Sequence, residues 1–249
     1  MNTEHPTLKA DGAIALSVVI PCRNDAAALA ELLPGMMPGL LPGDEVIVAD
    51  ASADGASAEV ARLHGVRVVR CEKPGRGTQM NAGAAAARGD VLVFSHADTQ
   101  LGAGHLEAIR QAVADARVQC GAFFKDTGAH YPAWAWADPL IRWWMGRWGV
   151  IYGDQSVFLR RGVFEKLGGF APIPLMEDVE MSPRLRRTGG FRLIDPPLRT
   201  SMRRFARRGR FFTRLQNVFY VLMFRCGVSA ERIYRWYYGK PVDAPDPQS

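Results

Sequence analysis

The stretch LSVVIPCRNDAAALAELLPGMMPGLLPGDEVIVAD, residues 16–50, decides the fold class. Two short apolar runs, Leu16–Pro21 and Glu45–Asp50, enclose a segment rich in Ala and Leu that begins at Ala26. Runs of this length and composition indicate buried strands, and the segment between them is typical of a helix. A strand, a helix and a second strand in this order predict a parallel pair joined by a crossover helix.

The same alternation continues to residue 95, with strands predicted at 66–72 and 91–95 and helices at 26–33, 56–63 and 78–88. It predicts an α/β fold in which helices cover both faces of a mostly parallel sheet. Beyond residue 100 we expect a helix at 106–118, strands at 121–125 and 156–159, a turn at Arg161-Gly162, and one or two helices within 203–238.

Composition and charge narrow the class of protein. The 249 residues are 48% hydrophobic and 22% charged, which excludes collagen, coiled coil and general disorder. The net charge is +6, yet ten arginines and one acid fall between Arg199 and Arg235. A basic segment of this kind suits nucleic acid, an anionic membrane or the phosphates of a substrate.

The division of the chain follows from these patterns. We expect a polar lead-in at 1–13, one domain at 14–200, a basic helical appendage at 201–240 and a tail at 241–249. The lead-in has no apolar core of a signal peptide, and the longest apolar run near the C-terminus, 218–224, is too short to cross a bilayer. A cytoplasmic protein is expected.

Polar residues follow each of the first four predicted strands. Because the carboxyl ends of parallel strands share one edge of a sheet, these residues are expected to converge on a ligand. They are Arg23, Asn24 and Asp25, then Asp50 and Ser52, then Lys73 to Gly77, and finally His96, Ala97 and Asp98. The alternative for any single loop is that its polar residue only caps a helix.

The loop KPGRGTQMNAG, residues 73–83, has the chemistry of a diphosphate site. Its glycines let backbone amides approach a ligand, and its cations and the following helix N-terminus attract negative charge. The glycine spacing fits neither a dinucleotide fingerprint nor a Walker A loop. Candidate ligands here are Lys73, Arg76, Gly77 and Asn81.

Carboxylates supply the remaining candidates. Asp50, assisted by Ser52, can accept hydrogen bonds from a nucleobase or a ribose, and His96-x-Asp98 can hold a divalent ion. The segment Glu177-Asp178-x-Glu180 opens a predicted helix. Acids there either favour the helix dipole or include a general base.

The order of these motifs resembles that of the family 2 glycosyltransferases with the GT-A fold. The motifs are VVIPCRND (18–25), VIVADAS (46–52), KPGRGTQMNAG (73–83), VLVFSHADT (91–99), GDQSVFLRRGVFEKLGGF (153–170) and MEDVEMSPRLRRTG (176–189). The chain looks most like the small bacterial members, some of which are assigned to arsenosugar biosynthesis.

The resemblance implies transfer of a sugar from a nucleotide-diphosphate sugar to an acceptor hydroxyl, with inversion at the anomeric carbon. A UDP-sugar is the expected donor. It places Pro21, Arg23, Asn24 and Asp50 around the nucleoside, Asp98 at a Mn²⁺ or Mg²⁺ ion, and Asp178 as base with Glu177 beside it. It also places Gly153, Asp154 and Gln155 near the acceptor or donor sugar.

One residue departs from the family's motif pattern, and one cluster of residues is not part of that pattern. His96 occupies the position of the usual first aspartate of D-x-D, so a harder cation has one oxygen ligand fewer. The tryptophans around Trp144 either wall an acceptor pocket or fill a gap between helices.

Alternatives to the enzyme remain open. One is a non-catalytic protein that binds nucleotide sugars or polyanions on the same scaffold, and donor hydrolysis with Mn²⁺ discriminates it. Another is a nucleic-acid binder that uses the arginines, which predicts a steep salt dependence. The arginine-rich segment, residues 201–226, either lies on an anionic membrane or packs on the domain.

Overall fold

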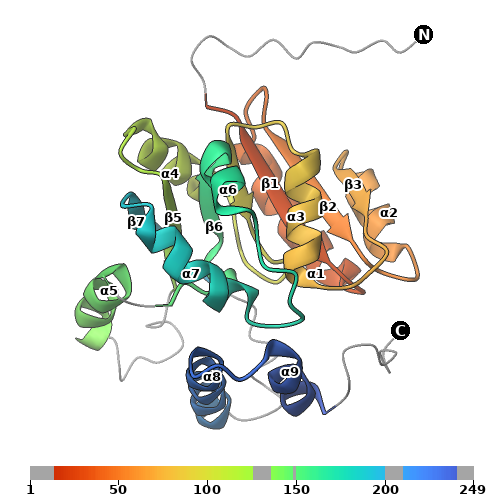
Figure 1. Ribbon diagram of the computed structural model, residues 1–249. Coiled ribbons are helices and arrows are strands. Elements are labelled where there is room, and N and C mark those ends of the chain that lie inside the picture. Colours follow the sequence, from red (N-terminus) through yellow and green to blue (C-terminus); the bar gives the residue numbers. More distant parts are fainter. Residues whose placement is uncertain (1–13, 126–135, 148–149, 200–209, 240–249) are drawn as a thin grey trace.

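One central sheet positions the candidate site. In the computed structural model, the described residues are 14–125, 136–147, 150–199 and 210–239. The strands are β1 (Leu16–Cys22), β2 (Glu45–Asp50), β3 (Arg67–Arg70), β4 (Val91–Phe94), β5 (Cys120–Lys125), β6 (Val157–Arg160) and β7 (Phe191–Leu198). They form a seven-stranded sheet in the order β3-β2-β1-β4-β6-β5-β7 (Figure 1).

The sheet is mostly parallel, as predicted. Strand β1 pairs in parallel with β2 and β4, β2 pairs in parallel with β3, and β5 with β7. Only β6 runs against its neighbours β4 and β5. The carboxyl ends of β1 to β4 therefore meet at one edge, which we call the carboxyl edge.

Helices cover both faces of this sheet. They are α1 (Ala26–Met36), α2 (Ala56–Leu63), α3 (Arg76–Ala86), α4 (Ala103–Ala114), α5 (Asp138–Arg147), α6 (Arg161–Leu167), α7 (Glu177–Arg187), α8 (Arg210–Arg225) and α9 (Ala230–Tyr238), with short 3-10 turns at Met37–Gly39 and Gly153–Gln155. One apolar cluster joins α1, α2 and α4 to one face, and a second joins α3, α6 and α7 to the other. The result is the expected three-layer arrangement.

Two local features differ from the sequence-based expectations. The turn expected at Arg161-Gly162 is wrong, because α6 begins at Arg161 directly after the extended Arg160. Strand β7 carries Pro196 and Pro197, which cannot donate to a ladder, and it lacks a β-branched pattern. Its place at the outer edge of the sheet explains why prolines are tolerated there.

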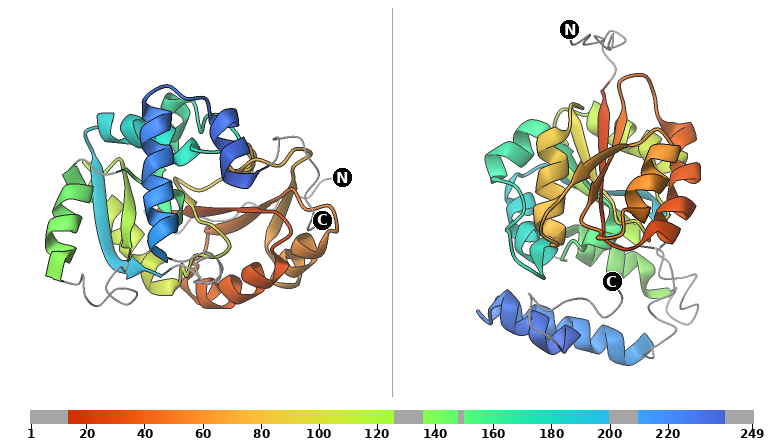
Figure 2. Two further views of the ribbon diagram at one scale, coloured as in Figure 1. Left: turned by 90° about the horizontal axis from the view of Figure 1, so that it is seen from below. Right: turned by 90° about the vertical axis from the view of Figure 1, so that its right-hand side faces the viewer.

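The C-terminal helices α8 and α9 take part in a third apolar cluster. Tyr220, Val221 and Ile233 pack on Leu175 and Val179 beside the start of α7. Figure 2 shows the two helices lying across the carboxyl edge. None of the described helices is long and apolar enough to span a membrane. The predictions for residues 1–13, 201–209 and 241–249 lie outside the described residues.

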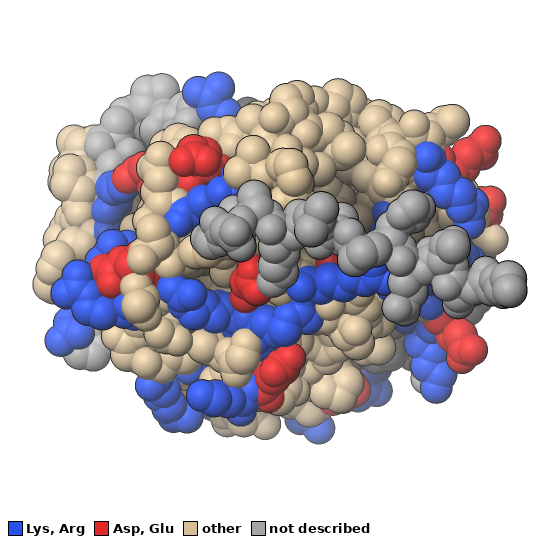
Figure 3. All heavy atoms as spheres, turned by 90° about the horizontal axis from the view of Figure 1, so that it is seen from above, with Lys and Arg blue, Asp and Glu red and all other residues tan. Residues whose placement is uncertain are grey.

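The amino ends of β1 to β4 face the opposite side of the molecule, where basic and acidic side chains alternate (Figure 3). Several arginines here bind the protein itself. Arg110 pairs with Asp44, Arg117 pairs with Asp115, and Arg161 donates to the carbonyl oxygens of Ala87 and Gly89. These arginines stabilise the ends of the strands and the loops between them.

The close packing of α3 on β1 gives a test of this architecture. A Cβ added at Gly83 would lie 2.3 Å from Cγ1 of Val19, so Gly83→Ala should overpack the interface and lower the free energy of unfolding by about 1–3 kcal/mol. Gly104→Ala on α4 is the matched control, since nothing lies within 4 Å of the added atom. It should leave stability unchanged or raise it by up to about 1 kcal/mol. Denaturant unfolding measures both, and equal stability of the two variants would contradict the packing.

Candidate functional site

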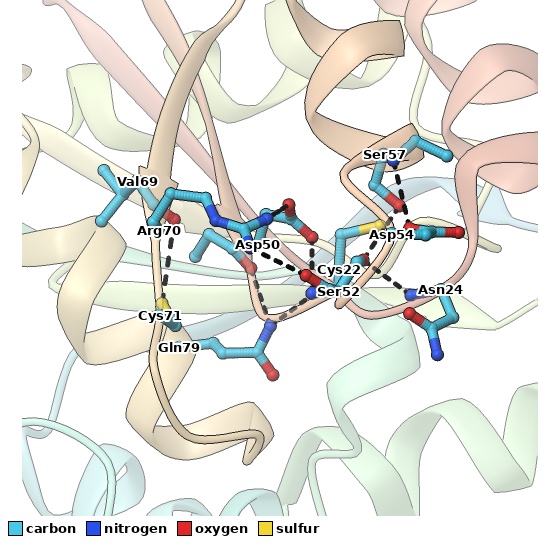
Figure 4. Close-up of polar contacts among 12 residues, drawn as sticks. Cys22, Asn24, Asp50, Ser52, Asp54, Ser57, Val69, Arg70, Cys71 and Gln79 are labelled. Atoms are coloured by element: carbon cyan, nitrogen blue, oxygen red, sulfur yellow. Dashed lines mark hydrogen bonds and ion pairs between the residues drawn. The ribbon is translucent and has the colours of Figure 1, made fainter. Parts of the chain in front are cut away.

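Asp50 ends β2 at the carboxyl edge, and its side chain is fully buried. The backbone N–H of Ser52 donates to its Oδ1 at 2.9 Å, and the Arg70 guanidinium pairs with its Oδ2 (Figure 4). Arg70 also donates to the carbonyl oxygen of Ser52 at 2.9 Å. The carboxylate thus has a partner on each oxygen before any ligand is bound.

Ser52 and Gln79 hold the neighbouring loop ends in place. The Ser52 hydroxyl accepts from the backbone N–H of Asn24 at 2.7 Å, and Asn24 has the left-handed φ of 49°. The buried Gln79 amide donates to the carbonyl oxygens of Cys22 and Ala49 at 2.8 and 2.7 Å (Figure 4). It therefore fixes α3 to the ends of β1 and β2.

An ion pair joins the starts of α3 and α7. Arg76 Nε lies 3.0 Å from Oε1 of Glu177, whose side chain is only 1% exposed. Burial works to lower the pKa of Arg76, but the charges of Glu177 and Asp178 outweigh it and raise that pKa. Burial also raises the pKa of Glu177, against the opposing charge of Arg76. The guanidinium therefore stays charged and compensates the buried acid.

Asp178 lies next to this pair and faces the turn at residues 153–155. Its Oδ2 accepts from the backbone N–H of Gly153 at 2.9 Å, and its Oδ1 from that of Val179 at 2.8 Å. Met176, just before the helix, has a left-handed φ of 72°. This turn directs Glu177 and Asp178 toward α3 and Gly153.

His96 follows β4 and completes the cluster. A Cβ at Gly153 would lie 2.7 Å from His96 Nε2, so that nitrogen is turned toward the glycine. Burial, followed by the charge of Arg76, lowers the pKa of His96 to about 4, against the opposing charges of Asp98, Asp154 and Asp178. The imidazole is thus neutral near pH 7.

The three carboxylates at Asp50, Asp98 and Asp178 therefore lie at the same edge. The charges of Asp98 and Asp178 both act on His96, and Asp50 lies two strands away from β4, roughly 10 Å at ordinary strand spacing. A distance of this order fits the span from a nucleoside to the phosphates it carries.

Several predicted ligands bind the protein backbone instead. The Asn81 amide donates to the carbonyl oxygen of Phe170 at 2.8 Å and accepts from its N–H at 2.9 Å, so both ends of the amide are engaged by the protein, and its place at the donor stays a prediction. The Gln155 amide binds the carbonyl oxygen of Phe123 and the N–H of Tyr152. Gly77 lies inside α3, where an added Cβ would be 2.6 Å from the carbonyl oxygen of Ala171, so it serves close packing.

Of the remaining predicted site residues, some lie at the carboxyl edge and others lie farther away. Pro21 and Ala97 are buried, Arg23 is half-buried and Lys73 is exposed in the loop before α3. Asp154 pairs with Lys125. Trp144 is exposed on α5, which Arg186 holds against the far end of α7 through the carbonyl oxygens of Met145 and Gly146. The predicted role of Trp144 at the sugar gains no support from this position.

Arg70 and Gln79 are site residues that the sequence analysis missed. Arg70 lies within the strand predicted at 66–72, and Gln79 is one polar residue in a predicted helix. The register Asp50 to Arg70 between β2 and β3 is the signal that places Arg70 beside the carboxylate. Sequence periodicity carries no such pairing information.

Comparisons with known proteins identify the family and the fold of this chain. The family model described as glycosyl transferase family 2 matches residues 17–168. An uncharacterized glycosyltransferase of Mycobacterium tuberculosis is 29% identical over 131 residues, which cover 52% of this chain and 58% of that relative. The match thus spans less than two thirds of the relative's length.

Solved structures share the fold. Glucosyl-3-phosphoglycerate synthase from Mycobacterium tuberculosis, in complex with Mn²⁺, UDP and glucosyl-3-phosphoglycerate, gives a TM-score of 0.59 at 21% identity, over 86% of this chain and 81% of that one. A mannosyltransferase from Pyrobaculum calidifontis, in complex with GDP-mannose and Mn²⁺, gives 0.61 at 21% identity, over 86% and 65%. The predicted GT-A fold class is thereby confirmed.

Proposed function

The chain belongs to glycosyl transferase family 2, and on that premise we propose that it transfers a sugar from a nucleotide-diphosphate sugar to an acceptor hydroxyl. The observation that carries the proposal is the convergence of Arg76, Glu177 and Asp178 beside the ends of β1, β2 and β4. Complexes of similar structures with UDP or GDP-mannose support a nucleotide-sugar donor, and among such donors we propose a UDP-sugar.

Asp178 is proposed as the general base of an inverting transfer. Two backbone N–H groups fix its carboxylate, which would take the proton of the acceptor hydroxyl as that oxygen attacks the anomeric carbon. The bond from that carbon to the diphosphate breaks on the opposite face. Arg76, with Lys73 nearby in the chain, would stabilise the negative charge on the leaving diphosphate.

A divalent ion fits the edge next to His96 if the donor supplies part of its coordination. Within the described ranges, no group of three or more His, Cys, Asp or Glu side chains is arranged to hold a metal. Asp98 offers a hard oxygen, and Mg²⁺-type sites commonly combine one or two carboxylates with substrate phosphates. When bound, the ion would neutralise charge on the diphosphate. His96 Nε2 is buried beside Gly153 and has no hydrogen-bond partner among the described residues.

Replacement of the base tests the catalytic role. Asp178→Asn should lower turnover by about 10²–10⁴-fold while donor affinity stays close to that of the unmodified protein. Glu180→Gln is the matched control, because Glu180 lies in the same helical turn and pairs with Arg184. Transfer or donor hydrolysis is followed by release of the nucleoside diphosphate. Unchanged turnover in Asp178→Asn would remove the base assignment, and donor binding without any turnover in the unmodified protein would favour the non-catalytic alternative.

Metal removal tests the role of Asp98. Treatment with EDTA should abolish nucleotide release, and Mn²⁺ should restore it. Asp98→Asn should raise the Mn²⁺ concentration needed for half-maximal rate by at least about tenfold, because a carboxylate ligand is lost. Full activity in EDTA, or an unaltered Mn²⁺ requirement in the variant, would contradict this role.

We also propose that α8 and α9 contact an anionic membrane surface. Their inner sides pack on the domain, whereas Val218, Phe219, Leu222 and Trp236 are exposed. Three exposed arginines lie on the same two helices, at positions 225, 232 and 235, against one acid at 231. Exposed apolar side chains bordered by arginines are typical of helices that lie in the interface of a bilayer.

Vesicle co-sedimentation tests this contact. The protein should sediment with phosphatidylglycerol vesicles at low salt, less at high salt, and little with phosphatidylcholine alone. Phe219→Ser combined with Leu222→Ser should abolish binding, whereas Leu63→Ser, at the exposed end of α2, should not. Equal sedimentation of all variants, or none of the unmodified protein at low salt, would rule the contact out.

A further inference from the structure

The burial of Asp50 raises a question about how a nucleoside would reach it. The side chain has no exposed surface, its Oδ1 accepts from Ser52, and its Oδ2 is paired with Arg70. The Arg70 side chain, in contrast, is 53% exposed. Figure 4 shows the guanidinium lying against the carboxylate. A nucleobase that arrives from solvent therefore meets Arg70 before Asp50.

The Arg70 guanidinium is held in one orientation. It binds Asp50 through one terminal nitrogen and the carbonyl oxygen of Ser52 through the other. Its backbone is fixed as well, because Arg70 pairs with Asp50 in the ladder between β2 and β3, and Cys71 donates its N–H to the carbonyl oxygen of Asp50 at 2.8 Å. A flat, fixed and half-exposed guanidinium costs little ordering when a ligand binds.

We propose that Arg70 is the residue that touches the nucleobase of the donor and that Asp50 is a positioning residue which acts through it. The inference rests on the proposed function, because it assumes a nucleotide donor. It names the contact that Asp50 was expected to make, and assigns it to a different side chain.

The sheet order favours the base over the phosphates as the partner of Arg70. Arg70 ends β3, which is three strands from β4, or roughly 14 Å at ordinary strand spacing. A phosphate held beside Asp98 at the end of β4 therefore lies farther from Arg70 than a base beside Asp50 does. Beside its contacts with Asp50 and Ser52, the half-exposed Arg70 guanidinium offers a flat face for stacking and N–H groups for base carbonyl oxygens.

Calorimetric titration of the whole protein with UMP and UDP, and with GMP and GDP alongside, tests the assignment. Arg70→Ala should weaken binding of the preferred base by about 5- to 150-fold, by the same factor for its mono- and diphosphate. Arg76→Gln should weaken the diphosphate more than the monophosphate. Arg67→Ala is the matched control, since Arg67 lies on the same strand at the amino end and also pairs with an acid, Glu45.

Two further variants separate contact from structure. Arg70→Lys keeps the charge beside Asp50 but lacks the flat face, so its melting temperature should hold while most of the affinity is lost. Asp50→Asn should weaken binding, and the double variant Asp50→Asn with Arg70→Ala should be no worse than Arg70→Ala alone, because both changes remove the same contact.

Each outcome decides the inference. Wild-type affinity in Arg70→Ala or Arg70→Lys overturns it and leaves the proposed function standing, as does a loss that grows with phosphate number. Additive losses in the double variant return the base contact to Asp50. If the unmodified protein binds none of the four nucleotides, the proposed function and the inference fall together.

Discussion

The ion pair between Arg76 and Glu177 is the interaction on which the rest of the site depends. Glu177 begins α7 in a buried position, and a buried carboxylate without a cation costs several kcal/mol. Arg76 on α3 supplies that cation and so stabilises the start of α7. Gly77 allows the approach, since any side chain would collide with the carbonyl oxygen of Ala171. The location of Asp178 is therefore set by residues from the first half of the chain.

The parts of the fold with strong local patterns could be predicted from the sequence. The predicted bounds of the strand at 45–50 and the helix at 56–63 coincide with β2 and α2, and α7 begins at Glu177 as expected. The pairing of strands that are distant in the sequence could not be predicted from local patterns. Nothing in the local composition shows that β6 inserts between β4 and β5, or that a segment with two prolines forms the outer strand β7.

The same distinction explains the candidate site. Convergence of Asp50 and Asp98 could be expected, because the carboxyl ends of parallel strands share an edge. Asp178 begins a helix, and only the family resemblance implied its place beside them. The hydrogen-bond partners of the side-chain amides at the site could not be predicted. Asn81 was expected at a ligand and binds the backbone of Phe170, whereas Gln79, which drew no attention, joins two strands. In sequence, an amide that meets a ligand and one that satisfies a buried carbonyl group are indistinguishable.

The late position of α8 and α9 in the chain has a consequence for biosynthesis. Leu175 and Val179 pack against Tyr220 and Ile233, which a ribosome adds between about 40 and 60 residues later. At ordinary elongation speeds of about 5–20 residues per second, these apolar side chains next to Asp178 stay uncovered for several seconds in the nascent polypeptide. The start of α7 therefore becomes fully packed only after the C-terminal helices have been synthesised, and until then its apolar side chains are exposed to whatever binds nascent chains.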